Sequence, residues 1–281
     1  MSNKKHINQK LDKQSRIVVL GGGESGVGAA ILAQQKGYDV FVSDFGKIKD
    51  RFKAELEAHQ IAFEEQVHTE EKILNADIVV KSPGIPEKVD IIKKIRAKNI
   101  AIISEIEWAA RFIDGKIVAI TGSNGKTTTT SLTYHILEKA GLNVAVAGNI
   151  GKSLARTVSE NHFDYYVVEV SSFQLDDIES FQPHISVITN ITEDHLDRYN
   201  YNFEEYIAAK MAITTNQDQN DYCIYCLDDA VTKQHIQAVR NTTCIPFSLE
   251  ESVSEGAFIQ DDQFIFQLKK NDLPCQLESL H

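Results

Sequence analysis

The sequence predicts an α/β protein made of two domains, each with its own parallel sheet. Short runs rich in β-branched residues alternate with helical runs along nearly the whole chain, which is the pattern of repeated β-α-β units. A glycine-rich turn joins a strand to a helix twice, at residues 21–28 and 122–125. The length of 281 residues leaves room for about two hydrophobic cores.

The first domain is expected over residues 16–114, after a polar tail at 1–15 that we expect to be flexible. A strand at 15–20 and another at 39–44, joined by a helix, predict a Rossmann-like parallel sheet. Further helices are expected at 50–60, up to 73–76 and at 89–98, and further strands at 61–67, 77–81 and 100–104. Residues 105–107 are interpreted as a solvated helix start, and 112–115 as a short linker.

The first glycine turn has the spacing of a nucleotide-binding loop. Gly21, Gly23 and Gly26 match G-x-G-x-x-G between a strand and a helix, and Asp44 ends the next strand, where an acid binds ribose in dinucleotide folds. These residues keep an NAD-dependent oxidoreductase open as an alternative. Ser25 favours a terminal phosphate instead, because its hydroxyl joins the free N–H groups at the helix start.

A rigid loop follows the strand at 77–81. It contains Ser82, Pro83 and Gly84, at the carboxyl edge of the predicted sheet, where open α/β sheets bind their ligands. From the residues alone, a structural turn and a ligand contact are equally good interpretations.

The second domain is expected over residues 115–281 and opens with the strongest motif, which predicts an α/β domain like that of P-loop ATPases. A buried strand at 117–120 runs into a turn with two residues between its glycines, where the general P-loop rule has four. Backbone N–H groups of such a turn bind phosphate, Lys126 adds charge near the outer phosphates, and the Thr127 hydroxyl suits Mg²⁺. The predicted ATP contacts are Gly122, Ser123, Asn124, Gly125, Lys126, Thr127 and Thr128.

Polar residues also end later strands of this domain. Glu169 closes a buried strand, where an unpartnered carboxylate is costly, so we expect it to bind a metal or to join a polar network. The segment 190–198, which includes His195, crowds polar side chains at the end of another strand. Lys210 lies on an amphipathic helix, and its residues alone predict a lysine that extends from the helix to solvent. Strands are also expected at 143–147, 163–170, 185–190, 222–227 and 243–247, helices at 131–140 and 206–213, and a hairpin at 257–268.

Composition excludes several classes of protein. The net charge of −11 argues against a nucleic-acid or membrane-binding surface. Cys223 and Cys226 form C-x-x-C within a strand and have no second ligand pair, so core packing is favoured over a metal or redox role. No apolar stretch reaches membrane length and no signal core precedes the first strand. We therefore expect a cytoplasmic protein, and a monomer.

Five motifs together resemble the Mur ligase family of peptidoglycan synthesis. They lie in order at residues 121–128 (T-G-S-N-G-K-T-T), 148–151 (G-N-I-G), 169–175 (E-V-S-S-F-Q-L), 190–198 (N-I-T-E-D-H-L-D-R) and 206–210 (Y-x-x-A-K). The short phosphate turn is that family's variant of the P-loop. The resemblance covers nearly the whole chain, and the run at 169–175 is most similar to that of members that add D-glutamate.

The resemblance implies an activity and a set of site residues. ATP would phosphorylate the carboxylate of UDP-N-acetylmuramoyl-L-alanine, and the amine of D-glutamate would attack the acyl phosphate to form an amide. Lys126, Lys210 and His195 would serve catalysis, and Thr127, Glu169, His195 and a carbamylated Lys210 would hold two Mg²⁺ ions. The UDP-substrate contacts implied are Ser25, Gly26, Asp44, Ser82, Pro83, Gly84 and Asn149.

One departure from the family concerns length. Mur ligases have three domains, and we expect this chain to end within or just after the second, without the domain that brings the amino acid. We therefore expect it to bind the UDP-substrate but to ligate poorly or not at all. Besides the oxidoreductase, the alternatives are a non-ligating P-loop nucleotide-binding module and a sibling ligase that adds another amino acid, or glutamate to folate.

Overall fold

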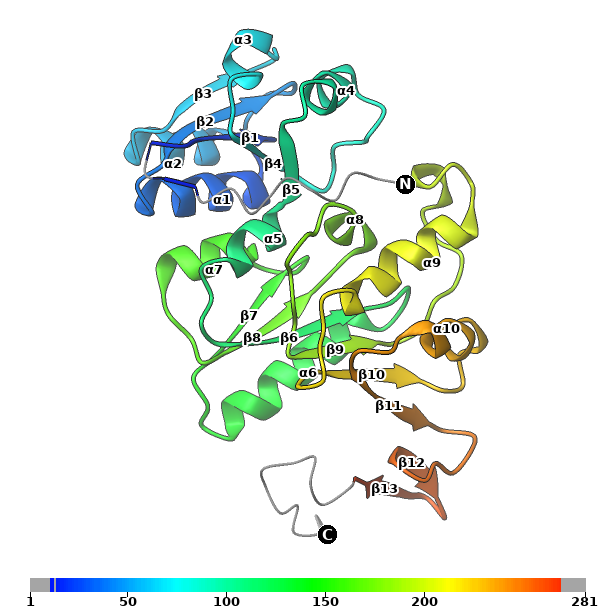
Figure 1. The fold of residues 1–281 in the computed structure, drawn as a ribbon. Coiled ribbons are helices and arrows are strands. Elements are labelled where there is room, and N and C mark those ends of the chain that lie inside the picture. Colours follow the sequence, from blue (N-terminus) through cyan, green and yellow to red (C-terminus); the bar gives the residue numbers. More distant parts are fainter. Residues whose placement is uncertain (1–10, 13, 269–281) are drawn as a thin grey trace.

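The computed structural model describes residues 11–12 and 14–268, and it contains two sheets flanked by helices (Figure 1). The first sheet is parallel, in the order β3-β2-β1-β4-β5, and the second has the order β13-β12-β11-β10-β9-β6-β8-β7. The second sheet is parallel except for the pair β12 and β13. The predicted α/β fold is confirmed, while most of the tail expected at 1–15 and the residues beyond 268 lie outside the described residues.

The first sheet lies between two helical layers. Its strands are β1 (Arg16–Leu20), β2 (Asp39–Asp44), β3 (Ala62–Glu65), β4 (Ile78–Lys81) and β5 (Ala101–Ser104). Helices α1 (Glu24–Gln35), α2 (Asp50–Ala58) and α5 (Glu105–Ala110) pack on one face, and α3 (Glu70–Ile73) and α4 (Asp90–Ala97) pack on the other. Alternate residues of β1 supply the two faces, because strand side chains alternate in direction.

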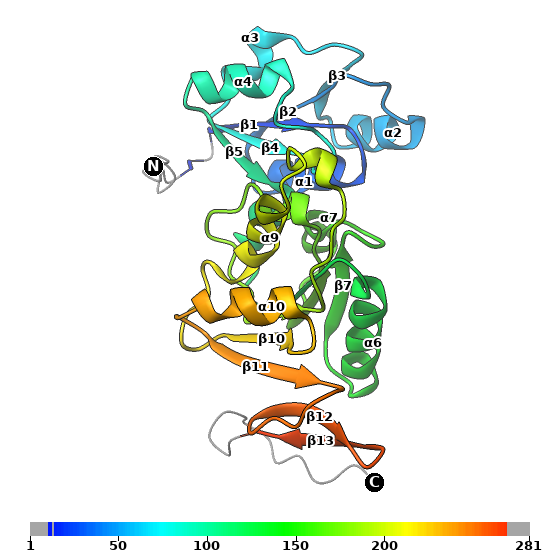
Figure 2. The same cartoon turned by 90° about the vertical axis from the view of Figure 1, so that its right-hand side faces the viewer.

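The second sheet is built in the same way. Its strands are β6 (Lys116–Thr121), β7 (Val144–Gly148), β8 (Tyr165–Glu169), β9 (Ile185–Ile188), β10 (Tyr222–Cys226), β11 (Thr243–Ser248), β12 (Gly256–Gln260) and β13 (Gln263–Gln267). Helix α6 (Lys126–Lys139) covers one face, and α7 (Leu154–Glu160), α8 (Ser172–Leu175), α9 (Phe203–Met211) and α10 (Ala230–His235) lie on the other (Figure 2). Asp261 and Asp262, both at positive φ, turn the predicted hairpin at the far end.

The two sheets share one apolar cluster. It runs from the face of the first sheet that α1 covers, through α5 and α7, to the face of the second sheet that α7, α8 and α9 cover. The expectation of a solvated helix start at 105–107 is wrong, because α5 begins there inside this cluster. Glu105 and Glu107 are 1% and 0% exposed, and Glu107 accepts hydrogen bonds from the backbone N–H groups of Glu179, Ser180 and Phe181.

Cys223 is fully buried in β10, as the core-packing interpretation expects. In the described part of the chain, no helix combines the length and the apolarity needed to cross a bilayer.

Candidate functional site

The phosphate turn lies between β6 and α6, as the sequence predicts. Its two glycines are required for different reasons. Gly125 has φ +82°, the left-handed region that glycine adopts without strain, and a Cβ there would meet nothing within 4 Å. Gly122 has φ +148°, and a Cβ on it would lie 1.9 Å from Thr189 Oγ1. The turn therefore leaves open space beside Gly125 at the start of α6, where a phosphate group can approach.

The segment after β9 holds this turn in place. The Asn124 N–H donates to Asn190 Oδ1 at 2.9 Å, and Thr189 Oγ1 donates to the Asn124 carbonyl at 2.7 Å. Ser123 Oγ donates to the carbonyl of Thr192 at 2.8 Å. These bonds join the predicted ATP turn to the start of the polar segment 190–198.

Two lysines converge on the Gly122 carbonyl. Lys126 Nζ donates to it at 2.9 Å, and Lys210 Nζ does so at 2.7 Å. The expectation that Lys210 extends to solvent is wrong: the residue is 2% exposed, because this face of α9 packs into the shared apolar cluster. Burial, and then the charge of Lys126, lower the pKa of Lys210 to about 7. A buried amine at this pKa is in large part neutral at physiological pH.

Glu169 ends β8 with its carboxylate buried against the phosphate turn. The residue is 1% exposed, Oε2 accepts from Thr127 Oγ1 at 2.7 Å, and Oε1 accepts from Asn149 Nδ2 at 2.8 Å. Both partners are neutral, and no ion pair to Glu169 exists among the described residues. The polar network expected at Glu169 is confirmed. The carboxylate and the Thr127 hydroxyl are hard oxygen ligands, so this position fits Mg²⁺.

Only some of the predicted metal ligands lie at the phosphate turn. Thr127 and Glu169 are in contact, and Lys210 reaches the same turn from α9. The side chain of His195 is 59% exposed, and its ring lies 5.4 Å from that of Phe173. Over the residues that the structure describes, no three His, Cys, Asp or Glu side chains form a group that could hold a metal. Asn149, predicted to contact the muramoyl group, donates to Glu169.

The first glycine turn lies between β1 and α1, with Ser25 in the first turn of the helix. Asp44 shapes the turn, because its carboxylate accepts from the N–H groups of Gly22 at 2.6 Å and Gly46 at 2.7 Å. Gly26 must lack a side chain, since a Cβ would lie 1.8 Å from the Gly21 carbonyl oxygen.

Ser82, after β4, meets this turn. A Cβ on Gly21 would lie 2.5 Å from Ser82 Oγ, which is buried and has no hydrogen-bond partner among the described residues. The structure thus brings Gly26, Asp44 and Ser82 to one end of the first sheet. The Ser82 hydroxyl is left as an unused donor there.

A cavity of about 260 Å³ opens beside the first glycine turn. Its lining consists of Gly22, Gly23, Glu24, Asp44, Lys47, Lys49, Arg51 and Phe52. The three cations were not predicted from the sequence. Their alternate spacing directly after Asp44 was the available signal, since it places positive charge beside a turn suited to an anion.

Comparison with known proteins decides the family. The family model described as "Mur ligase middle domain" matches residues 120–278, more than half of the chain. The chain belongs to the Mur ligase family. A second model, described as "MurD N-terminal domain", matches residues 16–91. Each glycine turn therefore lies in its own matched stretch, and the resemblance carried by the five motifs is confirmed.

Three curated Mur ligases illustrate the similarity. The chain is 50% identical to a protein of Christiangramia forsetii, 52% to one of Bacteroides thetaiotaomicron and 53% to one of Cytophaga hutchinsonii. All three are named UDP-N-acetylmuramoylalanine–D-glutamate ligase. The matches cover 89%, 88% and 94% of this chain, but 56%, 56% and 59% of the relatives. The chain thus spans a little over half the length of these relatives.

Solved structures show the same fold. The UDP-N-acetylmuramate:L-alanyl-gamma-D-glutamyl-meso-diaminopimelate ligase of Neisseria meningitides matches with a TM-score of 0.62 at 20% identity, over 89% of this chain and 86% of that one. A murein peptide ligase of Psychrobacter arcticus matches with a TM-score of 0.59 at 18% identity, over 91% and 59%. At these identities the likeness concerns the fold alone.

Proposed function

We propose that this chain binds UDP-N-acetylmuramoyl-L-alanine and Mg-ATP as part of a ligase that adds D-glutamate in cytoplasmic peptidoglycan precursor synthesis. Residues 16–114 would form the UDP-binding domain and residues 115–281 the ATP-binding domain. The observation that carries the proposal is the buried Glu169 carboxylate on the Thr127 hydroxyl, at the start of the phosphate-binding helix. The names of the curated relatives support D-glutamate as the amino acid.

The part of the proposal that concerns ATP rests on the second glycine turn, between β6 and α6. Mur ligases in general depend on ATP and Mg²⁺. Turn N–H groups and Lys126 would face the outer phosphates and stabilise charge on the transferred group. Thr127 and Glu169 would hold a Mg²⁺ ion, which neutralises phosphate charge when bound.

We propose that Lys210 carries a carbamate in the working enzyme. Its neutral amine would add CO₂ at Nζ and release a proton, which gives an anionic oxygen ligand for a second ion, with His195 as another. The pKa of about 7 supports this, because an ordinary lysine is almost wholly charged at neutral pH. A ¹³C-carbamate signal in wild type, absent from Lys210→Gln, is the expected result; identical spectra would contradict it.

The part of the proposal that concerns the UDP-substrate rests on the first glycine turn and the cavity beside it, which three cationic side chains line. Ser25 and Gly26 lie at the helix start, whose free N–H groups favour phosphate. Lys47, Lys49 and Arg51 add positive charge around the same opening, as a diphosphate requires. Ser82, Pro83 and Gly84 would contact the nucleotide from the β4 side.

The test measures the binding of each ligand separately on the same chain. Isothermal titration with Mg-ATP and with UDP-N-acetylmuramoyl-L-alanine is expected to detect both in the wild type. Lys126→Ala should lose nucleotide binding and keep the UDP-substrate, while Lys139→Ala, at the other end of α6, should keep both. Equal loss of both ligands in Lys126→Ala would contradict two independent sites.

Other ligands separate the alternatives. Tight NADH binding without UDP-substrate binding would indicate an oxidoreductase. Mg-ATP binding alone would indicate a nucleotide-binding module that does not ligate. Preference for UDP-N-acetylmuramate without L-alanine, or for an already extended peptide, would indicate a sibling ligase.

A further inference from the structure

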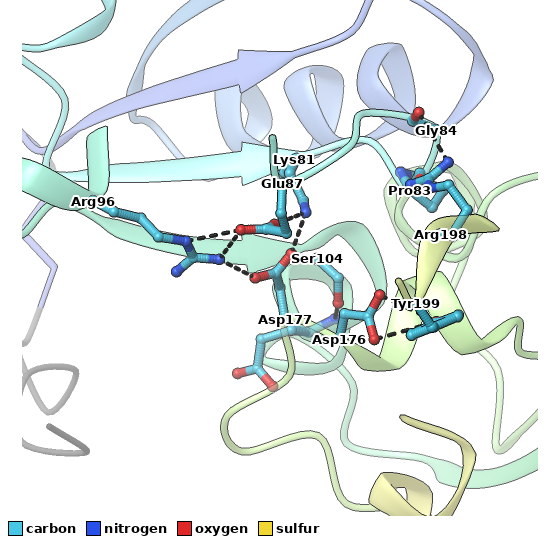
Figure 3. Close-up of polar contacts among 11 residues, drawn as sticks. Lys81, Pro83, Gly84, Glu87, Arg96, Ser104, Asp176, Asp177, Arg198 and Tyr199 are labelled. Carbon is cyan, nitrogen blue, oxygen red and sulfur yellow. Dashed lines mark hydrogen bonds and ion pairs between the residues drawn. The ribbon is translucent and has the colours of Figure 1, made fainter. Parts of the chain in front are cut away.

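Arg198 connects the predicted UDP loop to the second half of the molecule (Figure 3). It lies in the short 3₁₀ helix Leu196–Arg198, in the polar segment that follows β9. Its guanidinium donates to the carbonyls of Pro83 at 3.2 Å and Gly84 at 3.4 Å, and lies 4.5 Å from the centre of the Phe173 ring. One side chain thus touches the loop after β4 and the motif after β8.

An ion cluster fixes the ends of the same loop. Lys81, buried at the end of β4, pairs with Glu87 beyond the loop, and its Nζ lies 2.7 Å from Asp177. Arg96 of α4 lies 2.9 Å from the other oxygen of Asp177 (Figure 3). Asp177 follows α8 and is 7% exposed, so it reaches the loop from the second half. Asp177 therefore contacts the start of the loop at Lys81 and reaches its end, Glu87, only through Lys81 and Arg96. Arg198 contacts the middle of the loop.

The segment that carries Arg198 is itself anchored. Tyr199 stacks on Phe173 with ring centres 5.9 Å apart, and its hydroxyl donates to the Asp176 carboxylate at 3.3 Å. His195 packs against the same Phe173 ring. Phe173 therefore collects residues 195–199 at one place, and Arg198 extends from that place to the Pro83–Gly84 peptides.

The contacts of Arg198 orient the peptide groups of the loop. In a trans peptide the C=O and N–H point in opposite directions, and the described chain has no cis bond. With the Pro83 carbonyl turned toward Arg198, the Gly84 N–H points away from it. Gly84 is an exposed residue, and its N–H has no hydrogen-bond partner among the described residues. It is a free donor for an acceptor oxygen of a nucleotide.

We propose that Arg198 is a positioning residue that sets the Ser82–Gly84 loop for the uridine diphosphate end of the substrate. The inference rests on the proposed function, since it takes that nucleotide as the ligand. A guanidinium suits this role because its planar fork donates to two carbonyls at once, whereas an ammonium is a point charge. Arg198 would act through the loop and not through the phosphate turn.

Three variants test the inference by calorimetry. Arg198→Met should weaken UDP and UDP-N-acetylmuramoyl-L-alanine by the same factor, about tenfold or more, with Mg-ATP affinity unchanged. Arg198→Lys should recover part of the loss. Arg240→Met removes an exposed arginine whose hydrogen bond to a described residue is to the neighbouring Val239 carbonyl, and it should change neither affinity.

The outcomes separate the inference from the proposed function. A wild-type chain that binds no UDP-substrate refutes the proposed function. A wild type that binds it, with Arg198→Met binding equally well, refutes only the role of Arg198. Parallel loss of Mg-ATP affinity, or of unfolding free energy in urea, would show a general structural role and also overturn the inference.

Discussion

At the scale of single residues, Glu169 is the most informative side chain of the proposed ATP site. Its carboxylate is buried with two neutral donors, Thr127 and Asn149, and the described residues provide it with no cation. Burying an anion without a counter-charge costs free energy, which a divalent ion would offset. We therefore expect Glu169 to favour metal binding at the expense of the stability of the metal-free chain.

Glu169→Gln should separate these two effects. We expect Mg-ATP affinity to fall about tenfold or more, because the amide keeps the shape but loses the charge that attracts Mg²⁺. The free energy of unfolding without Mg²⁺ should stay the same or rise by about 1 kcal/mol. Titration calorimetry and urea unfolding measure the two quantities.

Glu160→Gln is the matched control, because Glu160 is exposed and its ion pair within the described part of the chain is a surface one, with Lys152. It should leave both quantities unchanged. Unaltered Mg-ATP affinity in Glu169→Gln would exclude Glu169 as a metal ligand.

At the scale of elements, both turns are β-strand, glycine turn and helix units. Gly125 adopts positive φ at the start of α6, and Gly141 does so just after its end, at +82° and +78°. A Cβ on either would meet no atom within 4 Å. The two positions thus carry the same backbone requirement, but only Gly125 faces the predicted phosphate site.

Alanine at these two glycines should therefore have one effect in common and one that differs. Each variant should lose about 1 kcal/mol of unfolding free energy through backbone strain. Only Gly125→Ala should weaken Mg-ATP binding, because its methyl group occupies the space a phosphate would approach. Equal affinities in the two variants would contradict this position for the nucleotide.

The elements were predictable because glycines, prolines and alternating apolar runs mark their ends. Gly37 ends α1, and Asp261 and Asp262 turn the last hairpin where the sequence indicates. The burial of individual side chains was less predictable. The residues of its helix alone predict Lys210 at the surface, yet α9 is covered on that side by residues far away in the sequence. The spacing of apolar residues on a helix indicates the direction of its buried face. It does not indicate whether a residue at the border of that face is covered by distant parts of the chain.

At the scale of the whole molecule, polar contacts between the halves were the least predictable feature. Arg156 of α7 pairs with Glu24 and Glu55 of the first half, both at 2.6 Å. Such pairs depend on how the two sheets face each other, which local sequence does not encode. The same holds for Glu105, whose carboxylate accepts from the Ala155 N–H within the shared apolar cluster.

Glu105 predicts how the stability of the whole molecule depends on pH. Complete burial raises its pKa from 4.5 to about 7, and the nearby carboxylate of Glu24 adds to the effect. Between these pH values the unfolded chain gives up the proton while the folded chain retains it, so the free energy of unfolding falls as pH rises. The shift corresponds to a loss of up to about 3 kcal/mol between pH 4.5 and pH 8.

Comparison with Glu105→Gln isolates this contribution, since glutamine does not titrate and keeps an acceptor for Ala155. Trp108, the only tryptophan of the chain and fully buried three residues along α5, reports unfolding by its fluorescence. In urea titrations, wild type should lose stability relative to Glu105→Gln as the pH is raised from 5 to 8. A difference that stays constant over this range would mean that Glu105 ionises without penalty between the two halves. In that case the interface admits more water than its burial indicates.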